Sequence, residues 1–376
     1  MSPPPKSLAR EALVSAPPGR TATAGPERPP RLVEDNRGAL AIDNRGAAAA
    51  LAIAQGLRLK REPRVAKLCD HAVAPLWTRR FGRLLLRRAL GGTAAPSPAV
   101  APSPAVDKKA SRAMLLDVMC GSGYPGLELR RRLGSDARLV AIDPSSALLD
   151  LARARAGTLA GRRVFFRSEG AEPTLPFAAE VYDVVLSNLG LWETAEPRRL
   201  LAELVRVTKP GGRVLATLPL AGTFGEVHRL LERELSRREL RESQLRLSTY
   251  LGSLSSAAEA RSWMMEAGLT DVNVDCEEYT LLFAGGVDFF LAPVIEYGPL
   301  LRWKEVVGQA HLQEVFTALR ESIDHEICRA PGEGPEANDA QSEDRDRALL
   351  LRWPRPFAVT VRAGCVSGRK PLPPEP

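Results

Sequence analysis

The segment from residue 115 to residue 133 constrains the fold of this chain more than any other part of its sequence. It opens with the apolar run Leu-Leu-Asp-Val at 115–118, turns through three glycines between residues 121 and 126, and regains helical spacing at 127–133. Glycine accepts positive φ and lets backbone approach a ligand with no Cβ in the way. The free N–H groups of a first helical turn then face that ligand. A strand, a glycine turn and a helix in this order predict a cradle for a nucleotide-like ligand.

The glycine spacing by itself leaves the class of ligand open. Gly121-x-Gly123-x-x-Gly126 matches the dinucleotide fingerprint, and Asp143 follows about 20 residues later, as that fingerprint requires. The loop therefore fits a nicotinamide-dependent oxidoreductase as well as a methyltransferase. An ordinary tight turn between a strand and a helix is a third interpretation.

Beyond the glycine loop, apolar β-type runs alternate with helical patterns. The predicted strands are 113–118, 138–142, 163–167, 181–187 and 213–218, and the predicted helices between them are 125–133, 145–156 and 197–207. This alternation is typical of a parallel sheet that helices cover on both faces. After residue 219 the pattern predicts a long helix, a second helix, a strand, a helical region and a last strand, at 224–245, 256–267, 271–283, 286–328 and 357–362.

The positive charge of the chain is concentrated at its N-terminal end. The net charge is +7 over 376 residues, and residues 1–112 carry 20 Lys and Arg against 8 Asp and Glu. Few aromatic residues are interleaved with these basic side chains, which argues against a nucleic-acid partner. We interpret the region as a solvated basic leader, with organellar targeting as the alternative.

The remaining composition excludes several other classes of protein. The five cysteines and four histidines are scattered without metal-ligand spacing, so no metal site is expected. Scattered cysteines are typical of reduced thiols, which favours a cytoplasmic location. No apolar run reaches the ~20 residues that span a bilayer. Nothing in the sequence indicates an oligomeric state.

Four landmarks along the chain decide between the interpretations of the glycine loop. They are Asp117-x-x-x-Gly121-x-Gly123, the strand end Val140-Ala141-Ile142-Asp143, the segment 183–192 (Asp-Val-Val-Leu-Ser-Asn-Leu-Gly-Leu-Trp), and the segment 204–215 with its Lys-Pro-Gly-Gly turn. In this order they resemble the class I S-adenosylmethionine-dependent methyltransferases, in particular the type 11 small-molecule enzymes. Nicotinamide-binding domains do not ordinarily carry the Lys-Pro-Gly-Gly reversal, which favours the methyltransferase.

The resemblance implies a fold and a division of the chain. The fold is α/β, with a doubly wound, Rossmann-like, mostly parallel sheet of seven strands, a helical cap and a disordered leader. The implied regions are the leader (1–64), N-terminal helices over the cofactor site (65–92), a proline-rich linker (93–110), the cofactor-binding core (111–222), cap helices (223–270), C-terminal strands with a helical insertion (271–365) and a disordered tail (366–376).

The resemblance also implies where S-adenosyl-L-methionine would bind. Gly121, Ser122 and Gly123 would hold its amino-acid end, with Asp117 close to the ammonium group. Asp143 would accept the two ribose hydroxyls in charge-assisted hydrogen bonds, or would act as a helix cap beside Ser145.

The remaining implied contacts lie after the third and fourth strands. The Ala171 N–H and an acid at Glu169 or Glu172 would hold the adenine. Asn188 would face the methyl group at the carboxyl edge of the sheet, where open α/β sheets bind ligands. Two positions depart from the family pattern. Met119 stands where glycine is usual and would narrow the pocket unless it turns away, and Gly170 stands where an acid is expected.

The sequence therefore predicts an enzyme that transfers a methyl group from S-adenosylmethionine to a small-molecule oxygen, nitrogen or carbon acceptor. No catalytic residue is assigned. The alternatives are a nicotinamide-dependent oxidoreductase and a non-catalytic protein that retains the methyltransferase fold, which the departures at Met119 and Gly170 suggest.

Overall fold

A computed structural model describes residues 52–91, 112–170, 174–328 and 356–374 of the chain. The predicted adenine contacts Ala171 and Glu172 lie outside these residues. So do the first 51 residues of the leader and the whole of the proline-rich linker (93–110).

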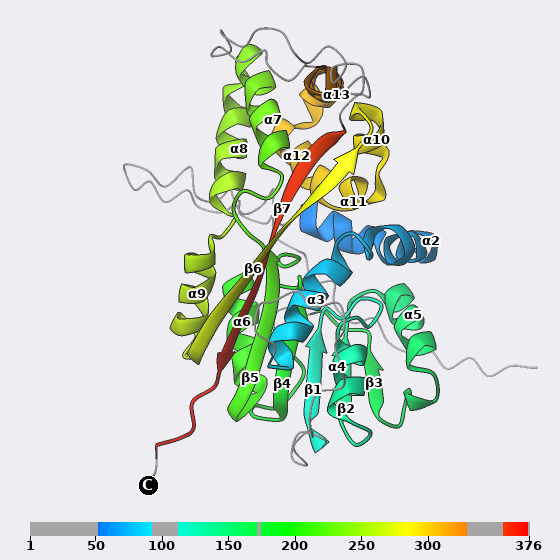
Figure 1. The fold of residues 1–376 in the computed structure, drawn as a ribbon, viewed down its shortest axis with the longest axis vertical. Coiled ribbons are helices and arrows are strands. Elements are labelled where there is room, and N and C mark those ends of the chain that lie inside the picture. The colour runs from blue at the N-terminus through cyan, green and yellow to red at the C-terminus, as the bar shows by residue number, and fades with distance from the viewer. Residues whose placement is uncertain (1–51, 92–111, 171–173, 329–355, 375–376) are drawn as a thin grey trace, which may run out of the picture. The chain divides into compact units, whose positions relative to one another are not determined.

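A seven-stranded sheet is the framework of the described structure (Figure 1), with the strand order β3-β2-β1-β4-β5-β7-β6. Strands β1 to β5 pair in parallel, and β7 is antiparallel to both of its neighbours. This confirms the doubly wound, mostly parallel α/β fold. The strands are β1 (Met114–Val118), β2 (Arg138–Ile142), β3 (Val164–Arg167), β4 (Tyr182–Asn188), β5 (Thr208–Pro219), β6 (Thr270–Phe283) and β7 (Phe357–Arg369).

Helices cover both faces of the sheet because successive strand residues point to opposite sides. Leu115 of β1 packs in one apolar cluster, together with side chains of α3, α4 and α5. Its neighbour Leu116 packs in a second cluster, together with α6 and α9. The covering helices are α3 (Thr78–Ala89), α4 (Gly126–Leu133), α5 (Ser146–Ala156), α6 (Pro197–Val207) and α9 (Ala257–Glu266).

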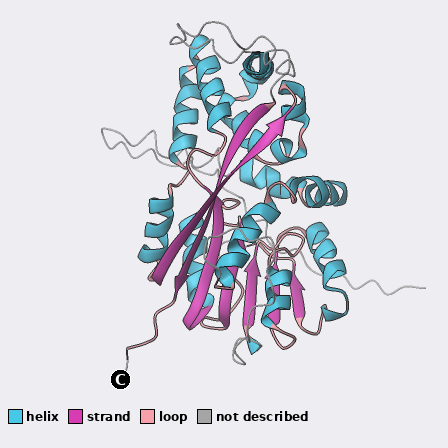
Figure 2. Ribbon diagram, in the orientation of Figure 1, coloured by secondary structure: helices cyan, strands magenta, loops and turns pink. Residues whose placement is uncertain are grey.

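The remaining helices form a cap around the far ends of β6 and β7 (Figure 2). Trp303 is fully buried at its centre and stacks on Phe289 with ring centroids 6.0 Å apart. The cap helices are α7 (Gly225–Arg237), α8 (Arg241–Gly252), α10 (Gly286–Leu291), α11 (Pro293–Glu296), α12 (Pro299–Val307) and α13 (Leu312–Cys328).

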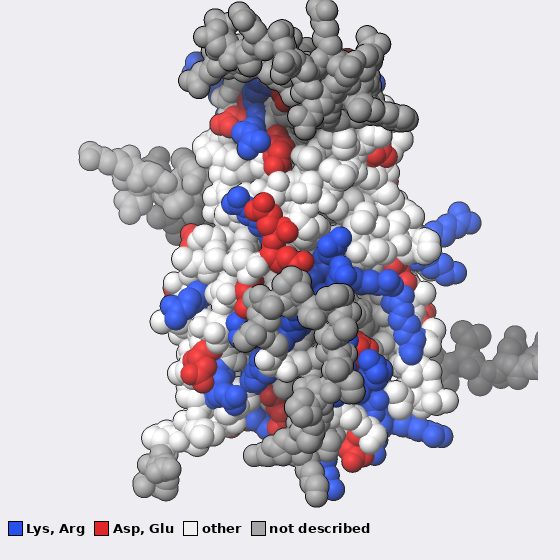
Figure 3. Space-filling view, in the orientation of Figure 1, with Lys and Arg blue, Asp and Glu red and all other residues white. Residues whose placement is uncertain are grey.

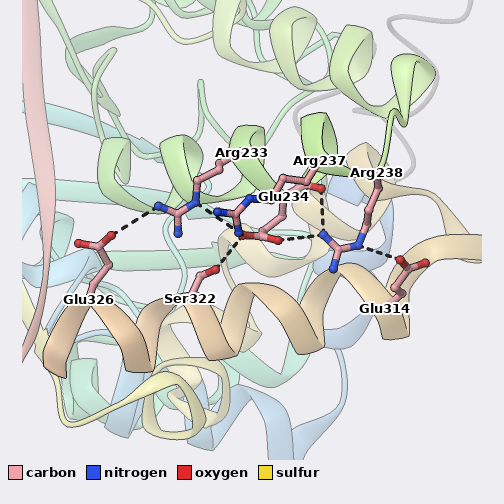
Figure 4. A network of polar contacts seen from close by, with 7 residues as sticks. All are labelled: Arg233, Glu234, Arg237, Arg238, Glu314, Ser322 and Glu326. Carbon is pink, nitrogen blue, oxygen red and sulfur yellow. Dashed lines mark hydrogen bonds and ion pairs between the residues drawn. The ribbon is translucent and has the colours of Figure 1, made fainter. Parts of the chain in front are cut away.

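A buried carboxylate joins α7 to α13 within the cap (Figure 4). Glu234 is 3% exposed, accepts a hydrogen bond from Ser322 at 2.8 Å and pairs with Arg238 at 2.8 Å. Arg237 lies 3.1 Å from the same carboxylate. The partners hold the pKa of Glu234 below its ordinary value although burial alone would raise it. The network therefore joins these two helices through a carboxylate that is itself shielded from water, while the Arg237 side chain remains 63% exposed.

Several predicted elements differ in the structure. The single helix expected at 224–245 is two helices, because Glu239 adopts φ 54° and ends the first of them. The resemblance also implies that the strand predicted at 357–362 is an end strand of the sheet, but β7 pairs with both β5 and β6 and lies between them. The Lys-Pro-Gly-Gly segment does not separate two elements as a turn but lies within β5. It shifts the register of β5 against β4, because Thr208 pairs with Tyr182 and Arg213 pairs with Val184.

The predicted leader also contains ordered structure. Residues 52–59 are helical, and α2 (Pro63–Leu68) and a π-helical turn (Cys69–Val73) follow. The alanine-rich sequence that leads into the helix at 52–59 favours helical structure, because alanine has the highest helix propensity.

The basic character of the N-terminal part reappears on these helices. Residues 52–91 contain ten Lys and Arg against two acids, and Figure 3 shows blue side chains gathered over this region and the neighbouring α4 and α5. Some of them are structural. Arg88 forms a two-pronged ion pair with Asp275 of β6, at 2.5 and 2.7 Å, which ties α3 to the sheet.

Candidate functional site

A cavity opens where β1, β2 and β4 end, and we call it the ligand cavity. Its walls come from five parts of the chain: residues 52–60, the segment 69–78, the loops after the three strands, the start of α7, and α11 with α12. Four of the predicted site residues line it, namely Gly121, Ser122, Asp143 and Asn188. The carboxyl edge of the sheet therefore brings together residues that lie up to 67 positions apart in the sequence.

The two predicted loop glycines have different roles. Gly121 has φ 54° and faces open space, with no atom within 4 Å of where a Cβ would stand. It is therefore free to approach a ligand closely. Gly123 has φ 95°, but a Cβ there would lie 2.6 Å from Leu127 Cδ1. Gly123 thus serves the packing of the loop on α4, and it does not line the ligand cavity.

Asp143 is the central carboxylate of the ligand cavity. It is only 5% exposed, and its two oxygens accept hydrogen bonds from the backbone N–H groups of Gly121 at 2.8 Å and Ser145 at 2.9 Å. Each carboxylate oxygen retains a further lone pair. Burial raises the pKa of Asp143 to about 6 despite these two bonds. The side chain therefore both organises the loop and offers acceptor capacity to a ligand.

Ser122 and Asn188 are held by neighbouring protein groups. The Ser122 hydroxyl donates to Asp70 at 2.5 Å. The Asn188 amide nitrogen donates to the Thr78 carbonyl at 3.0 Å, and its oxygen accepts from Thr217 at 2.7 Å. Asn188 thus fixes the start of α3 against the end of β4, and its orientation in the cavity wall is set.

Asp117 lies beneath the loop and not in the cavity wall. It is fully buried, and its oxygens have no hydrogen-bond partner by distance and angle within the described structure. A Cβ on Gly126 would stand 2.3 Å from its Oδ2. Burial raises the pKa of Asp117 well above its ordinary value. The sequence-based contact with the cofactor ammonium stays a prediction.

An ion pair that the sequence did not reveal crosses the ligand cavity. Lys60 Nζ lies 2.5 Å from Glu193 Oε1, and the Ser145 hydroxyl donates to the Lys60 carbonyl at 2.6 Å. Burial alone would lower the pKa of Lys60, but Glu193 raises it above its ordinary value. The helix at 52–59 and its following lysine therefore form one wall of the site next to Asp143.

No histidine in the described residues lines this cavity. His228 is buried and its Nε2 accepts a hydrogen bond from Trp303 Nε1 at 3.1 Å. Burial lowers the pKa of His228 to about 4. Its position and its engaged nitrogen give it a structural role within the cap.

Met119 lines the cavity with a backbone conformation that favours glycine. Its φ is 61°, which costs an ordinary side chain about 1–2 kcal/mol. Its side chain turns toward Gly190, where a Cβ would stand 3.1 Å from Met119 Cγ. Glycine would adopt this backbone conformation without strain.

Replacing Met119 with glycine is expected to strengthen binding of S-adenosylhomocysteine severalfold. The substitution removes a side chain from the cavity wall, and the relief of φ strain roughly offsets the entropy cost of glycine, about 0.5–1 kcal/mol. Calorimetric titration measures the affinity and urea denaturation the stability. Met119→Leu, which retains both bulk and strain, should bind like the wild type. Weaker binding by Met119→Gly would show that the methionine side chain contacts the ligand.

Comparison with known families identifies the core of the chain. Residues 115–212 match a family model described as "Methyltransferase domain". The demethylmenaquinone methyltransferase of Lactococcus lactis is 33% identical over 112 residues, which cover 28% of this chain and 44% of that enzyme. A 2-phytyl-1,4-naphtoquinone methyltransferase of Synechococcus elongatus is 35% identical over 99 residues, covering 26% and 42%. The chain thus spans less than half the length of these curated relatives.

Solved structures show a weaker likeness. Phosphoethanolamine N-methyltransferase 2 of Haemonchus contortus, solved with S-adenosylhomocysteine, has a TM-score of 0.38 and 15% identity, over 77% of this chain and 52% of that chain. The [4+2]-cyclase SpnF has a TM-score of 0.36 and 18% identity, over 79% and 95%. Neither likeness bears on activity.

Proposed function

We propose that this chain, whose residues 115–212 form a class I S-adenosylmethionine-dependent methyltransferase domain, transfers a methyl group from S-adenosylmethionine to a small molecule in the ligand cavity. One observation carries the proposal. Gly121, Asp143 and Asn188, which were selected as cofactor contacts from the sequence, line the same cavity at the carboxyl edge of the sheet.

The residues present fit the parts of this cofactor. Gly121 leaves open space beside backbone N–H groups for the amino-acid end. Asp143 offers the free lone pairs of a buried carboxylate, which suits two ribose hydroxyls. When bound, the cofactor supplies an activated methyl carbon attached to a positively charged sulfur.

The protein's own contribution is to position the reactants and exclude water. Holding an acceptor in line with a reactive carbon gives effective molarities that reach roughly 10⁵–10⁸ M in well-oriented systems. Trp77 is 9% exposed and Phe224 is 3% exposed, and both line the cavity near Asn188. These rings orient an apolar body and displace water around it. No base is required for a nucleophile that is already deprotonated.

The acceptor is proposed to be a small molecule with an apolar or aromatic body. The curated relatives named above act on quinone compounds, as their names state. In this chain, Trp77, Trp192, Phe224 and Val294 provide a matching apolar lining. The methylated atom of this acceptor is an oxygen, a nitrogen or a carbon.

A thermal-shift titration with S-adenosylhomocysteine and with NAD tests the proposal. S-adenosylhomocysteine should raise the midpoint of unfolding in a saturable way, because it binds only the folded state, and NAD should leave it unchanged. Stabilisation by NAD alone would favour an oxidoreductase. Binding of S-adenosylhomocysteine without methyl transfer to any small molecule would favour a non-catalytic protein of this fold.

None of the helices in the described part of the chain combines the length and apolar character that crossing a bilayer would need.

A further inference from the structure

Two cations line the ligand cavity, and only one has an acidic partner. Lys60 is paired with Glu193 at 2.5 Å. Arg302 of α12 also lines the cavity. Among the described residues no carboxylate oxygen forms an ion pair with its guanidinium group, and the charge of Glu193, which is already paired with Lys60, acts on it only from a longer distance. A partly buried charge without an opposite charge or full hydrogen bonding is costly. A guanidinium group of this kind in a cavity wall indicates that an anionic ligand binds to it.

The orientation of Arg302 is set by Trp192. Its guanidinium carbon lies 3.9 Å from the centroid of the Trp192 ring, and Nη2 donates to the Trp192 carbonyl at 2.7 Å. Stacking holds the planar group in one orientation. The guanidinium group has five N–H donors, and this one hydrogen bond uses only part of that capacity. The arginine is thus held in place with donors left for a ligand.

Arg302 belongs to the half of the cavity that the cap builds. Gly121 and Asp143 lie at the ends of β1 and β2, with Lys60 near Asp143, where the cofactor is proposed to bind. Val294 and Tyr297 come from α11 and the turn after it, and Arg302 follows on α12. An anion at Arg302 would therefore belong to the acceptor.

We propose that Arg302 binds an anionic group of the methyl acceptor, a carboxylate or a group of similar charge, while the acceptor's apolar body packs on Trp77, Phe224 and Val294. This inference rests on the proposed methyltransferase function. It narrows the acceptor to an amphiphilic anion and makes Arg302 a specificity residue. A planar guanidinium matches a carboxylate with two parallel hydrogen bonds, which a lysine at this position would not reproduce.

The test begins with a low-molecular-weight extract of the cells that produce the chain. An anion-exchange resin at pH 7 divides it into retained and unretained fractions, and each is incubated with the wild-type protein and S-adenosylmethionine carrying a tritiated methyl group. The label should enter compounds of the retained fraction only. In Arg302→Gln, the amount of this fraction that gives half-maximal labelling should rise at least tenfold, since hydrogen bonds to charged groups contribute about 1.5–3 kcal/mol. Arg302→Lys should be intermediate.

The matched control is Lys304→Gln, which removes an exposed cation from the same helix and should change nothing. Calorimetric titration of Arg302→Gln with S-adenosylhomocysteine and with 5′-methylthioadenosine, which lacks the amino-acid end, completes the test. Both should bind as they do to the wild type. Label in the unretained fraction, or a loss of affinity confined to S-adenosylhomocysteine, would overturn the assignment. A loss of affinity for S-adenosylhomocysteine alone would show that Arg302 binds the carboxylate of the cofactor. Absence of label in both fractions would instead overturn the proposed function.

Discussion

Replacing Asp143 with alanine is expected to weaken binding of S-adenosylhomocysteine by at least about a hundredfold. Each hydrogen bond from a ribose hydroxyl to this carboxylate is charge-assisted and contributes about 1.5–3 kcal/mol, and each 1.4 kcal/mol corresponds to about a tenfold change in Kd. Calorimetric titration at pH 8 measures the change. Asp150→Asn, on the exposed side of the following helix, is the matched control and should bind normally.

The pH dependence of binding provides an internal check on this assignment. Because burial raises the pKa of Asp143 to about 6, the free protein carries a neutral side chain below that pH. The affinity of the wild type should therefore fall about tenfold between pH 7.5 and pH 5, whereas Asp143→Ala should lack this dependence.

The raised pKa of Asp143 also means that the folded state holds an extra proton, relative to the unfolded state, between about pH 4 and pH 6. Stability contributed by Asp143 is full below that window and is lost as the pH rises through 6.

The alanine variant must be shown to fold, because Asp143 also accepts two backbone hydrogen bonds. Circular dichroism and a cooperative unfolding transition settle this. If the folded variant binds S-adenosylhomocysteine as tightly as the wild type, the ribose contact is wrong and Asp143 is only the loop's structural acceptor.

Replacing Trp303 with alanine is expected to lower the free energy of unfolding by about 3–5 kcal/mol, the range typical of a large buried aromatic side chain. Trp303 is fully buried, contacts Phe224 edge to face at 5.6 Å and stacks on Phe289. Its removal also leaves the acceptor nitrogen of His228 unpaired. Urea denaturation followed by circular dichroism measures the loss.

Trp303→Phe separates packing from hydrogen bonding at this position. It retains a ring but no donor, so its cost should be about 1–3 kcal/mol, that of an unsatisfied buried acceptor. Equal losses for the two variants would show that the hydrogen bond to His228, and not the packing of the indole ring, dominates the stability of the cap.

The sheet core was predictable because its signals are local. An apolar run marks a strand wherever it pairs, so the predicted strand 138–142 coincides with β2, and the helix predicted at 145–156 begins one residue before α5. The glycine loop and the acid after β2 have fixed places in such a sheet. For that reason, Gly121 and Asp143 could be placed in one site from the sequence.

The parts that were missed depend on contacts between distant residues. Whether β7 lies at an edge or between β5 and β6 is decided by pairing over more than 140 positions, as in Thr217 with Cys365. The Lys60–Glu193 ion pair spans 133 positions, and Lys60 lies in a stretch without a clear pattern. The orientation of Arg302 likewise depends on contacts with Trp192, which lies 110 positions earlier.

The continuous pairing of β6 with β7 has a mechanical consequence. The ladder runs unbroken from Asn273 opposite Ser367 in the sheet to Phe283 opposite Phe357 in the cap. Beyond Ala363, β7 pairs only with β6, so a continuous two-stranded ribbon joins the cap to the sheet, and any displacement of the cap at this point must bend that ribbon.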